Sequence, residues 1–387
     1  MRSTDSSCMA HSILCVVGAR PNFMKIAPVI AALNSASPHF FVRLVHTGQH
    51  YDAAMNHQHF DALGLPAPDV NLEVGSASHA VQTAEIMRRF EPVLDEEQPS
   101  AVLVVGDVNS TLACALVAVK KGVPVVHVEA GLRSGDRTMP EEINRILTDQ
   151  ISDLLFTTER DARANLLREG IGDERIHFVG NVMIDTLHHN LKKAVPVAWT
   201  MRQAGLADWD RTGAGYALLT LHRPSNVDDP DTFKSLLESI ADLSRRLPVI
   251  FPVHPRTRSR MEQYGLARFI ENFPIMQIPP VGYLEMLGLM KDARLVLTDS
   301  GGIQEETTAL GVPCVTLRNN TERPITVNEG TNVLAGNDPG RVLAACEEIL
   351  QSGGRAGRIP ELWDGRASER IAGIMQEWLG NGRRMVA

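Results

Sequence analysis

The sequence predicts an α/β protein with two doubly wound parallel-sheet domains, and two observations support this. Apolar, strand-like runs alternate with helical patterns along the whole chain: SILCVVGA, FFVRLVHTG, AVLVVGD, VPVVHVEA, DLLFTTE, YALLTLH, PVIFPVH, RLVLTD and VPCVTL. Continuous apolar strands separated by helices are typical of a parallel sheet covered on both faces. A length of 387 residues, at roughly 150 residues per domain, indicates two domains.

The alternation of strands and helices breaks between about Leu187 and Gly215, where the sequence is polar and carries Trp, Gly and Pro. We take this segment as the connection between an N-terminal domain, residues 1–186, and a C-terminal domain, residues 187–366. Near the end, SERIAGIMQEWLGN predicts an amphipathic helix, followed by a frayed tail.

Composition excludes several classes of protein. A formal net charge of −8 and a pI near 5.9 argue against nucleic acid as the main partner, because phosphate backbones need a basic face. The five cysteines are scattered without a CxxC pair, as in a reducing cytosol. No apolar run approaches the roughly 18 residues of a membrane span, and the polar start lacks the features of a signal peptide. We therefore expect a cytoplasmic enzyme or binding protein with no membrane partner.

The first two strand-like runs end in polar turns. GARPNFMK places Arg20 and Lys25 on either side of a proline at a helix start, which suits a phosphate but also suits two solvated cations. HTGQHYD is either a ligand site or a plain polar turn, and its candidates are His46, Gln49, His50 and Asp52.

The next two runs end in carboxylates. Asp107 follows a strand in GDVNST, where it either caps the next helix or takes part in acid/base chemistry. Glu129 ends the run VPVVHV, and a loop leads from it to Pro140, Glu141 and Glu142 at a helix start. Open α/β sheets bind ligands at this edge. Glu129 could instead simply end a strand, and the Pro-Glu-Glu group could be an ordinary helix start with acids near the positive dipole end.

In the second half, two His-Arg pairs stand at successive strand ends, at His222 in TLHRPSNVD and at His254 in PVHPRTR. A lone His is usually structural, but a repeated pair favours function, more strongly for His222. In TDSGGIQEE, Gly301 and Gly302 after Ser300 open a helix, so backbone N–H groups can approach a phosphate; a plain tight turn is the alternative. Two acids and two arginines stand close enough in sequence to reach the same ligand: Glu305, Glu306, Arg318 and Arg323.

Motifs that are absent narrow the chemistry further. ILCVVGARPNF has one Gly where a dinucleotide fingerprint needs three, and there is no GxxxxGK[ST], so bound NAD and a P-loop are disfavoured. TDSGG lacks the first Gly of a GxSxG elbow, and the H-x-E at His127 lacks the partners of a zinc set. The sequence therefore predicts a phosphate-binding enzyme with a carboxylate cluster, no metal and no cofactor.

The motifs GARPNFMK, HTGQHYD, GDVNST, HVEAGLRSGDRTMPEEINR, FVGNVMIDT, TLHRPSNVD, TDSGGIQEE and RNNTERP, in this order, resemble the non-hydrolysing UDP-N-acetylglucosamine 2-epimerases from about Ile13 to Leu379. The resemblance implies a GT-B fold of two Rossmann-like domains facing a cleft, with the C-terminal helix in residues 367–387 completing the N-terminal domain. It also implies a homodimer that interconverts UDP-GlcNAc and UDP-ManNAc.

Residue by residue, the resemblance implies two sets of site residues. The catalytic set is Asp107, Glu129, Glu141 and His222. The set expected to bind UDP is Arg20, Lys25, His254, Ser300, Gly301, Gly302, Glu306 and Arg323. Glu142 is left as helix-start chemistry.

The sequence also departs from the family pattern. The loop between Gly135 and Pro140 is shorter than in many members, and Met286 stands where many have an aromatic residue. These departures leave open an epimerase of a modified UDP-sugar, such as a 3-acetamido or uronate derivative. A hydrolysing epimerase, a GT-B glycosyltransferase and a non-catalytic nucleotide-sugar sensor also stay as alternatives.

Overall fold

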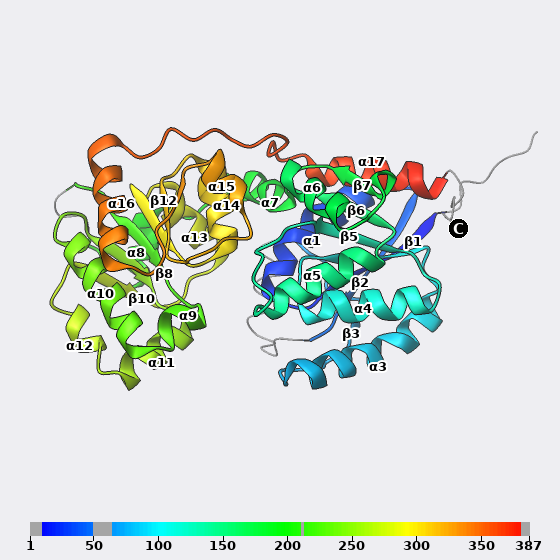
Figure 1. The fold of residues 1–387 in the computed structure, drawn as a ribbon, viewed down its shortest axis with the longest axis horizontal. Coiled ribbons are helices and arrows are strands. Elements are labelled where there is room, and N and C mark those ends of the chain that lie inside the picture. Colours follow the sequence, from blue (N-terminus) through cyan, green and yellow to red (C-terminus); the bar gives the residue numbers. More distant parts are fainter. Residues whose placement is uncertain (1–9, 49–63, 210–212, 381–387) are drawn as a thin grey trace, which may run out of the picture. The chain divides into compact units, whose positions relative to one another are not determined.

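The structure, a computed structural model, describes residues 10–48, 64–209 and 213–380. The chain divides into two compact units, of which unit 1 comprises residues 1–186 and 361–387 and unit 2 comprises residues 187–360. Each unit contains one sheet with helices packed on it (Figure 1).

Unit 1 is built on a seven-stranded, all-parallel sheet in the order β3-β2-β1-β4-β5-β6-β7. Its strands are β1 (His11–Val17), β2 (Phe40–His46), β3 (Val70–Asn71), β4 (Ala101–Val105), β5 (Val125–Ala130), β6 (Leu154–Thr157) and β7 (Ile176–Phe178). Its helices are α1 (Arg20–Ser35), α3 (His79–Glu97), α4 (Asn109–Lys120), α5 (Pro140–Ile151), α6 (Arg160–Arg168), the 3₁₀ turn η1 (Asp173–Arg175), α7 (Val182–Leu191), which continues into unit 2, and α17 (Ala367–Gly380). The chain order reverses between β1 and β4, which makes their carboxyl ends the switch point where open α/β sheets bind ligands.

Both faces of this sheet are buried, as the apolar runs predict. In β1, Cys15 and Val17 join the core under α1 and α17, whereas Leu14 and Val16 join the core under α3 and α4. Figure 1 shows α3 and α4 on one side of the unit 1 sheet and α1 and α17 on the other. The alternation follows from the two-residue period of a strand.

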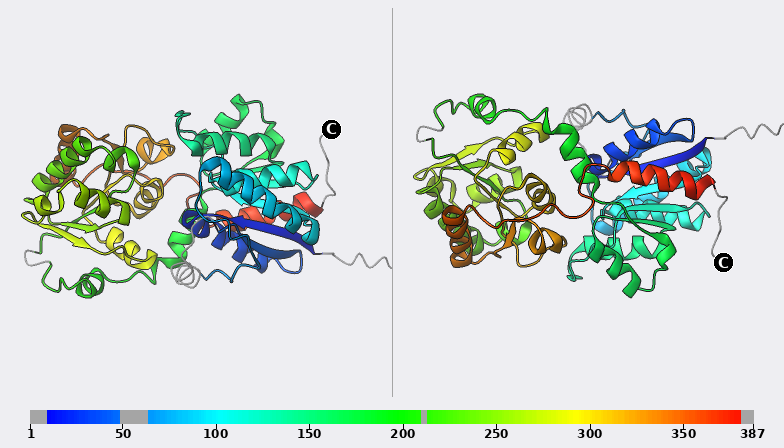
Figure 2. Two further views of the ribbon diagram at one scale, coloured as in Figure 1. Left: turned by 90° about the horizontal axis from the view of Figure 1, so that it is seen from below. Right: turned by 90° about the horizontal axis from the view of Figure 1, so that it is seen from above.

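Helix α17 returns to unit 1 and packs along α1, as the right-hand view in Figure 2 shows. The Asp185 carboxylate accepts hydrogen bonds from the N–H groups of Ala367 (3.0 Å) and Ser368 (2.7 Å), which fixes the start of α17. The Trp363 indole N–H donates to the Thr158 carbonyl at 3.0 Å. Buried bonds therefore tie the chain end to unit 1.

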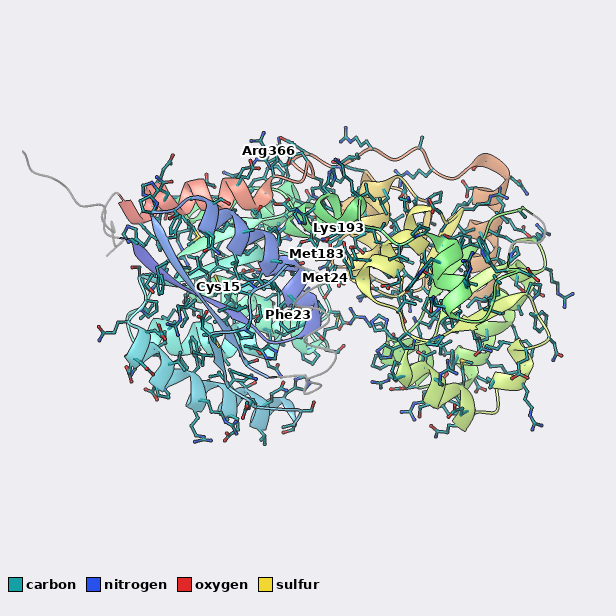
Figure 3. All side chains as sticks on the ribbon, turned by 180° about the vertical axis from the view of Figure 1, so that it is seen from behind. Cys15, Phe23, Met24, Met183, Lys193 and Arg366 are labelled. Carbon is teal, nitrogen blue, oxygen red and sulfur yellow. The ribbon has the colours of Figure 1, made fainter. Side chains whose placement is uncertain are left out.

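Helix α7 is held against α1 by a partly buried hydrogen bond. Met183 and Met24, labelled in Figure 3, belong to these two helices, and the Thr186 hydroxyl donates to the Met24 carbonyl at 2.5 Å. Met24 directly precedes Lys25, so this hydrogen bond fixes the part of α1 that carries a candidate site residue.

Unit 2 has a six-stranded, all-parallel sheet in the order β10-β9-β8-β11-β12-β13. Its strands are β8 (Ala217–Thr220), β9 (Val249–Pro252), β10 (Ile275–Ile278), β11 (Leu295–Thr298), β12 (Cys314–Thr316) and β13 (Asn332–Leu334). Its helices are α8 (Val197–Gln203), α9 (Pro224–Val227), α10 (Pro230–Ser244), α11 (Pro255–Gln263), α12 (Ala267–Ile270), α13 (Tyr283–Lys291), α14 (Gly301–Leu310), α15 (Pro324–Asn328) and α16 (Pro339–Ser352). The switch point of this sheet lies between β8 and β11.

The segment from Leu187 to Gly215, expected to be a connection, contains the end of α7 and helix α8. It packs within unit 2, where the Val195 N–H donates to the Leu284 carbonyl at 3.0 Å. Gly288 permits this approach, because a Cβ there would lie 1.8 Å from the Val195 carbonyl oxygen. Most of this segment is therefore ordered structure that belongs to unit 2.

Every strand-like run named from the sequence forms a strand, but β3, β7, β10 and β13 were not among those runs. These four strands are the edges of the two sheets. An edge strand has one neighbour and is short, so it lacks a continuous apolar run.

In the described part of the chain, no helix is long and apolar enough to cross a membrane. The described cysteines, Cys15, Cys114, Cys314 and Cys346, are all buried and unbridged. Within the same residues, no group of three or more His, Cys, Asp or Glu side chains is arranged to hold a metal ion.

Candidate functional site

The candidate residues of unit 1 gather at the carboxyl ends of β1, β4 and β5. Lys25 is on α1 after β1, Asp107 follows β4, and Glu129 is the penultimate residue of β5. The parallel pairing of β1 with β4 and of β4 with β5 brings these ends to one edge of the sheet. The switch point of unit 1 therefore carries two carboxylates and a cation.

Glu129 has a strained backbone. Its φ of +73° lies in the left-handed region, and the pairing of β5 with β6 shifts register between Val128 and Ala130. A non-glycine residue in this conformation costs about 1–3 kcal/mol and persists only where the surroundings impose it. Bulges at strand ends re-aim side chains. The bulge directs the Glu129 carboxylate into an ion pair with Lys25, and both side chains are buried.

Gly106 makes room for this ion pair. Its φ is +68°, and a Cβ at this position would lie 3.0 Å from the Lys25 Nζ and 3.3 Å from a Glu129 Oε. The Asn22 side chain closes the group by donating to the Val105 carbonyl at 2.9 Å. The sequence predicted Lys25 as a phosphate ligand; in the structure its ammonium group pairs with Glu129.

Arg145 organises the second carboxylate. Its guanidinium is buried and donates to Asp107 (2.6 Å) and to Glu142 (2.7 Å). Glu142 in turn accepts the N–H groups of Ser134 (3.0 Å) and Gly135 (2.9 Å). Glu142 therefore holds the loop after β5, which is a more specific structural role than the helix-start chemistry assigned from the sequence.

Glu141 differs from its neighbour. It is partly exposed in the first turn of α5 and has no hydrogen-bond or ion-pair partner among the described residues. Asp107 is 27% exposed. Both carboxylates are therefore accessible to a ligand, whereas Glu142 is not.

His127 on β5 and Asp149 on α5 form a second polar group next to these strand ends. His127 is fully buried; its Nδ1 lies 2.6 Å from Asp149, and its Nε2 lies 2.8 Å from the Gly106 carbonyl oxygen. Asp149 also accepts the Gly131 N–H at 3.0 Å and pairs with Arg133 at 2.7 Å. These bonds tie together the turns after β4 and β5, and therefore fix the backbone on either side of the carboxylates.

Arg20 is the first residue of α1, at the carboxyl end of β1. His46 is buried at the end of β2, with its ring 5.4 Å from that of Phe23. The other candidates of the HTGQHYD turn, Gln49, His50 and Asp52, lie outside the described residues.

In unit 2, His222 follows β8 and Asp299 follows β11, across the switch point of that sheet. The His222 Nδ1 lies 2.8 Å from an Asp299 carboxylate oxygen; the His222 side chain is 36% exposed and that of Asp299 is fully buried. Asp299 also accepts the backbone N–H groups of His222 and Arg223, both at 2.9 Å.

Asp299 is held in its charged form. Burial raises the pKa of its carboxyl, but the hydrogen bond and charge of His222 and the two backbone N–H donors outweigh burial, so the pKa lies below its ordinary value. Asn226 adds a weaker donor at 3.2 Å and spans to the Leu317 carbonyl at 2.8 Å. A buried carboxylate with these donors is a fixed anchor for the imidazole.

His254 lies beside His222, with ring centroids 5.6 Å apart. Its Nδ1 accepts the Arg256 N–H at 3.2 Å, which caps the start of α11. His254 is exposed, so its ring remains accessible.

Ser300, Gly301 and Gly302 open helix α14. Ser300 is the N-cap but its side chain makes no capping bond, so it leaves the N–H groups of the first turn available for an anion. A Cβ on Gly301 would lie 2.9 Å from Glu322 and 3.1 Å from Arg323, so the glycine lets this helix start approach Arg323.

Arginines and carboxylates alternate around this helix start. Arg323 pairs with Glu305 (3.0 Å) and Glu322 (2.9 Å), and Glu322 also pairs with Arg318 (2.9 Å). Arg223 stands 4.0 Å from Glu322. Three guanidinium groups face two carboxylates, so the group has a positive excess beside a helix N-terminus, which suits an anion such as a diphosphate.

Glu306 is buried and accepts the Tyr283 hydroxyl at 2.9 Å. Burial raises the pKa of its carboxyl, the Tyr283 hydrogen bond lowers it and the charge of Glu305 raises it, with a net pKa of about 8. In this structure Glu306 is therefore a mostly protonated carboxyl at neutral pH.

Three contributors were missed by the sequence reasoning: Asp299, Arg145 and the His127–Asp149 pair. A signal existed for Asp299, since it is a charged residue at the end of the apolar run RLVL and directly precedes SGG. For Arg145 and Asp149 the sequence offers only helical spacing from Glu142, which ordinary solvated charges share.

Comparison with known proteins now adds the family. A family model described as UDP-N-acetylglucosamine 2-epimerase matches residues 32–376. A UDP-N-acetylglucosamine 2-epimerase of Methanococcus maripaludis is 46% identical over 345 residues, covering 88% of this chain and 92% of the relative. A UDP-2,3-diacetamido-2,3-dideoxy-D-glucuronate 2-epimerase of Pseudomonas aeruginosa is 42% identical over 371 residues, covering 93% and 98%.

A solved structure gives the same result. The crystal structure of Methanocaldococcus jannaschii UDP-GlcNAc 2-epimerase in complex with UDP-GlcNAc and UDP is 42% identical, with a TM-score of 0.84 over 95% of this chain and 99% of that one. The predicted fold type, two Rossmann-like α/β domains of the GT-B kind, is confirmed. The chain belongs to the UDP-N-acetylglucosamine 2-epimerase family.

Proposed function

We propose that this protein is a non-hydrolysing UDP-N-acetylglucosamine 2-epimerase, an isomerase that interconverts UDP-GlcNAc and UDP-ManNAc. The observation that carries the proposal is the strained, ion-paired Glu129 at the switch point of unit 1, in a chain 46% identical to a UDP-N-acetylglucosamine 2-epimerase. Strain of this kind is retained where a side chain must be held in one orientation.

The reaction explains why two kinds of group are needed. The C2 proton of the sugar is not next to a carbonyl, so a carboxylate can remove it only as positive charge builds at C1 while UDP departs. UDP leaves with the bonding electron pair, the C2 proton goes to a base, and a glycal forms. Re-addition of UDP after the proton returns on the opposite face gives the epimer. These reaction steps are redox-neutral and need no cofactor.

The carboxylates of unit 1 are proposed to move the proton. Glu129, Asp107 and Glu141 are the candidates, and exchange between two faces requires more than one of them. Acid/base groups typically contribute about a hundred- to ten-thousand-fold each. Two ion pairs support this assignment, because Arg145 orients Asp107 and Lys25 orients Glu129.

The groups of unit 2 are proposed to bind UDP and stabilise it as it leaves. The helix start at Ser300, Gly301 and Gly302 and the guanidinium of Arg323 would hold the diphosphate, with His222 and His254 as further polar contacts. Donors aimed at a developing anion are worth about 3 kcal/mol each. Arg20 is proposed to contribute to the same anion, and Glu306 to the ribose.

A second candidate substrate has a specific observation in its favour. The relative from Pseudomonas aeruginosa that acts on a diacetamido glucuronate is 42% identical over nearly its whole length. The same elimination and re-addition would serve that sugar, because the chemistry at C1 and C2 is unchanged. The relative with 46% identity is named a UDP-N-acetylglucosamine 2-epimerase, so we propose UDP-GlcNAc as the first substrate to test.

Proton NMR in D₂O tests both candidates. UDP-GlcNAc incubated with the protein is expected to give UDP-ManNAc with deuterium at C2, with no free ManNAc. Release of free sugar would indicate hydrolysis, and no change with UDP-GlcNAc but epimerisation of the diacetamido glucuronate would reassign the substrate. Transfer of the sugar to an added acceptor would point to a glycosyltransferase.

We also propose that the protein works as a homodimer and supplies a sugar donor for polysaccharide synthesis, as the family resemblance implies. Light scattering coupled to gel filtration tests the dimer, for which a mass near twice 42.4 kDa is expected. A mass of one chain at micromolar concentration would contradict it.

A further inference from the structure

We propose that Asp299 is a positioning residue that fixes the His222 imidazole with a proton on Nδ1 and so makes Nε2 its reacting nitrogen. This deepens the proposed function, on which its kinetic test rests. The carboxylate accepts from Nδ1 at 2.8 Å, and the backbone N–H of the same residue also donates to it at 2.9 Å. Both the ring and the backbone of His222 are therefore held by one side chain.

The anchor itself cannot move easily. Asp299 is fully buried at the end of β11, and it accepts further bonds from the Arg223 N–H (2.9 Å) and the Asn226 amide (3.2 Å). Just before it, the hydroxyls of Thr220 and Thr298 bond at 2.6 Å between β8 and β11. A carboxylate with its lone pairs occupied by backbone donors keeps a fixed direction, which orients a bound imidazole.

The other end of the ring is open. His222 is 36% exposed, and its Nε2 makes no hydrogen bond within the described ranges. A histidine whose Nδ1 donates to a carboxylate presents Nε2 to a ligand, as an acceptor when the ring is neutral and as a donor when it is cationic.

Unit 1 provides an internal contrast. His127 and Asp149 are the same two residue types at a similar distance, 2.6 Å, but both ring nitrogens are engaged, since Nε2 faces the Gly106 carbonyl. That ring is fully buried and has no position left for a ligand. The free Nε2 and the exposure of His222 are thus what separate a reacting pair from a structural one.

His254 completes the geometry with the opposite hydrogen-bond pattern. Its Nδ1 accepts the Arg256 N–H, so a neutral His254 carries its proton on Nε2. Two rings 5.6 Å apart are therefore fixed in opposite tautomers, one by a carboxylate and one by a helix start. Loss of Asp299 would remove this difference.

The test combines spectroscopy with a double-mutant cycle on the full chain. In ¹⁵N-histidine spectra, the resonances of His222 are assigned by their loss in His222→Gln. The neutral wild-type ring is expected to carry its proton on Nδ1, and in Asp299→Asn the two tautomers are expected to mix. A neutral wild-type ring protonated on Nε2 would overturn the proposal, and this measurement does not require Asp299→Asn to fold.

Kinetics then ask whether Asp299 acts through His222. With UDP-GlcNAc, Asp299→Asn should lower kcat by about 10- to 100-fold, the usual effect of losing an orienting partner, and change KM less. In the His222→Gln background the same substitution should cost less than about threefold, because coupled residues are not additive. Equal losses in both backgrounds would show a general structural role and contradict the proposal. If the wild type turns over no UDP-sugar, the proposed function fails while the spectra still decide the role of Asp299.

Discussion

The two units share a topology but use opposite charges at their switch points. In unit 1, the functional candidates are carboxylates held by cations, Glu129 by Lys25 and Asp107 by Arg145. In unit 2, the candidates are an imidazole and guanidinium groups held by buried carboxylates, His222 by Asp299 and Arg323 by Glu305 and Glu322.

This difference shows that the fold determines where a ligand can bind, at the switch point of each sheet, and that the charged residues there determine the reaction. Parallel strands end at one edge in both units, because their β-α connections run the same way. A carboxylate aimed by a cation can accept a proton from carbon, whereas cations aimed by carboxylates can receive an anion. Exchanging either partner should therefore damage one function and spare the other.

The largest effect is expected for Glu129→Gln. Loss of the base should abolish deuterium incorporation at C2, with a fall in turnover of about a hundred- to ten-thousand-fold. Since the groups proposed to bind UDP belong to unit 2, apart from Arg20, the affinity for UDP should stay the same. NMR in D₂O and calorimetry with UDP measure the two quantities.

Asp161→Asn is the matched control for Glu129→Gln, because it removes an exposed carboxylate of unit 1 at the start of α6. Its turnover should equal that of the wild type. Deuterium exchange retained in Glu129→Gln would remove Glu129 from the base role.

The two histidine–aspartate pairs should respond differently to His→Gln. His127→Gln leaves Asp149 and the Gly106 carbonyl without their buried partner, so the free energy of unfolding should fall by about 3 kcal/mol. His222→Gln also takes one donor from the buried Asp299, but that carboxylate keeps its two backbone donors and the ring is partly exposed, so the free energy of unfolding should fall less, by about 1 kcal/mol, while turnover falls. Urea unfolding measures the stability of the two variants, and kcat measures their turnover. An equal loss of stability in His127→Gln and His222→Gln would contradict the prediction.

Arg323→Gln should weaken UDP binding by about 10- to 100-fold, since hydrogen bonds to charged groups contribute about 1.5–3 kcal/mol. The substitution also leaves Glu305 and Glu322 without a shared cation, which repels an anion further. Calorimetric titration with UDP measures the change. Arg258→Gln, an exposed arginine on α11 in the same unit, is the control and should bind UDP normally.

The last effect is a pH dependence of stability, and it concerns Glu306, the carboxyl of unit 2 whose partner is the Tyr283 hydroxyl. Its pKa is raised to about 8 in the folded chain from an ordinary value of 4.5, so the folded state retains a proton that the unfolded state releases. Stability from this group is present below pH 4.5 and is lost as the pH rises toward about 8. The Tm of the wild type should fall over this range relative to that of Glu306→Gln, and parallel curves would contradict the shift.

Much of the fold could be read from the sequence, but not its edges. The central strands are covered on both faces, which demands continuous apolar runs such as AVLVV in β4. Edge strand β10 has the sequence IMQI and buries only its two ends, so no such run marks it. The edges form because a neighbouring strand is already in place.

The site was predictable to a similar degree. Residues at strand ends, such as Glu129 and His222, stand out because a charge interrupts an apolar run. Their partners were not predictable in the same way: Lys25 was expected to bind phosphate and pairs with Glu129, and Asp299 was not considered. Pairing depends on which side chains meet across β1, β4, β5, β8 and β11, and sequence separation does not reveal it.

The sequence by itself determined the two α/β units, the family, and which residue types stand where the strands end. Only the tertiary structure decided the direction and partner of each charge, because a bulge at Glu129 and the missing side chain of Gly106 permit contacts that no spacing rule contains. The same reason separates His127 from His222. Each lies close to an aspartate, and only the packing around the second ring nitrogen distinguishes a structural histidine from one that can react.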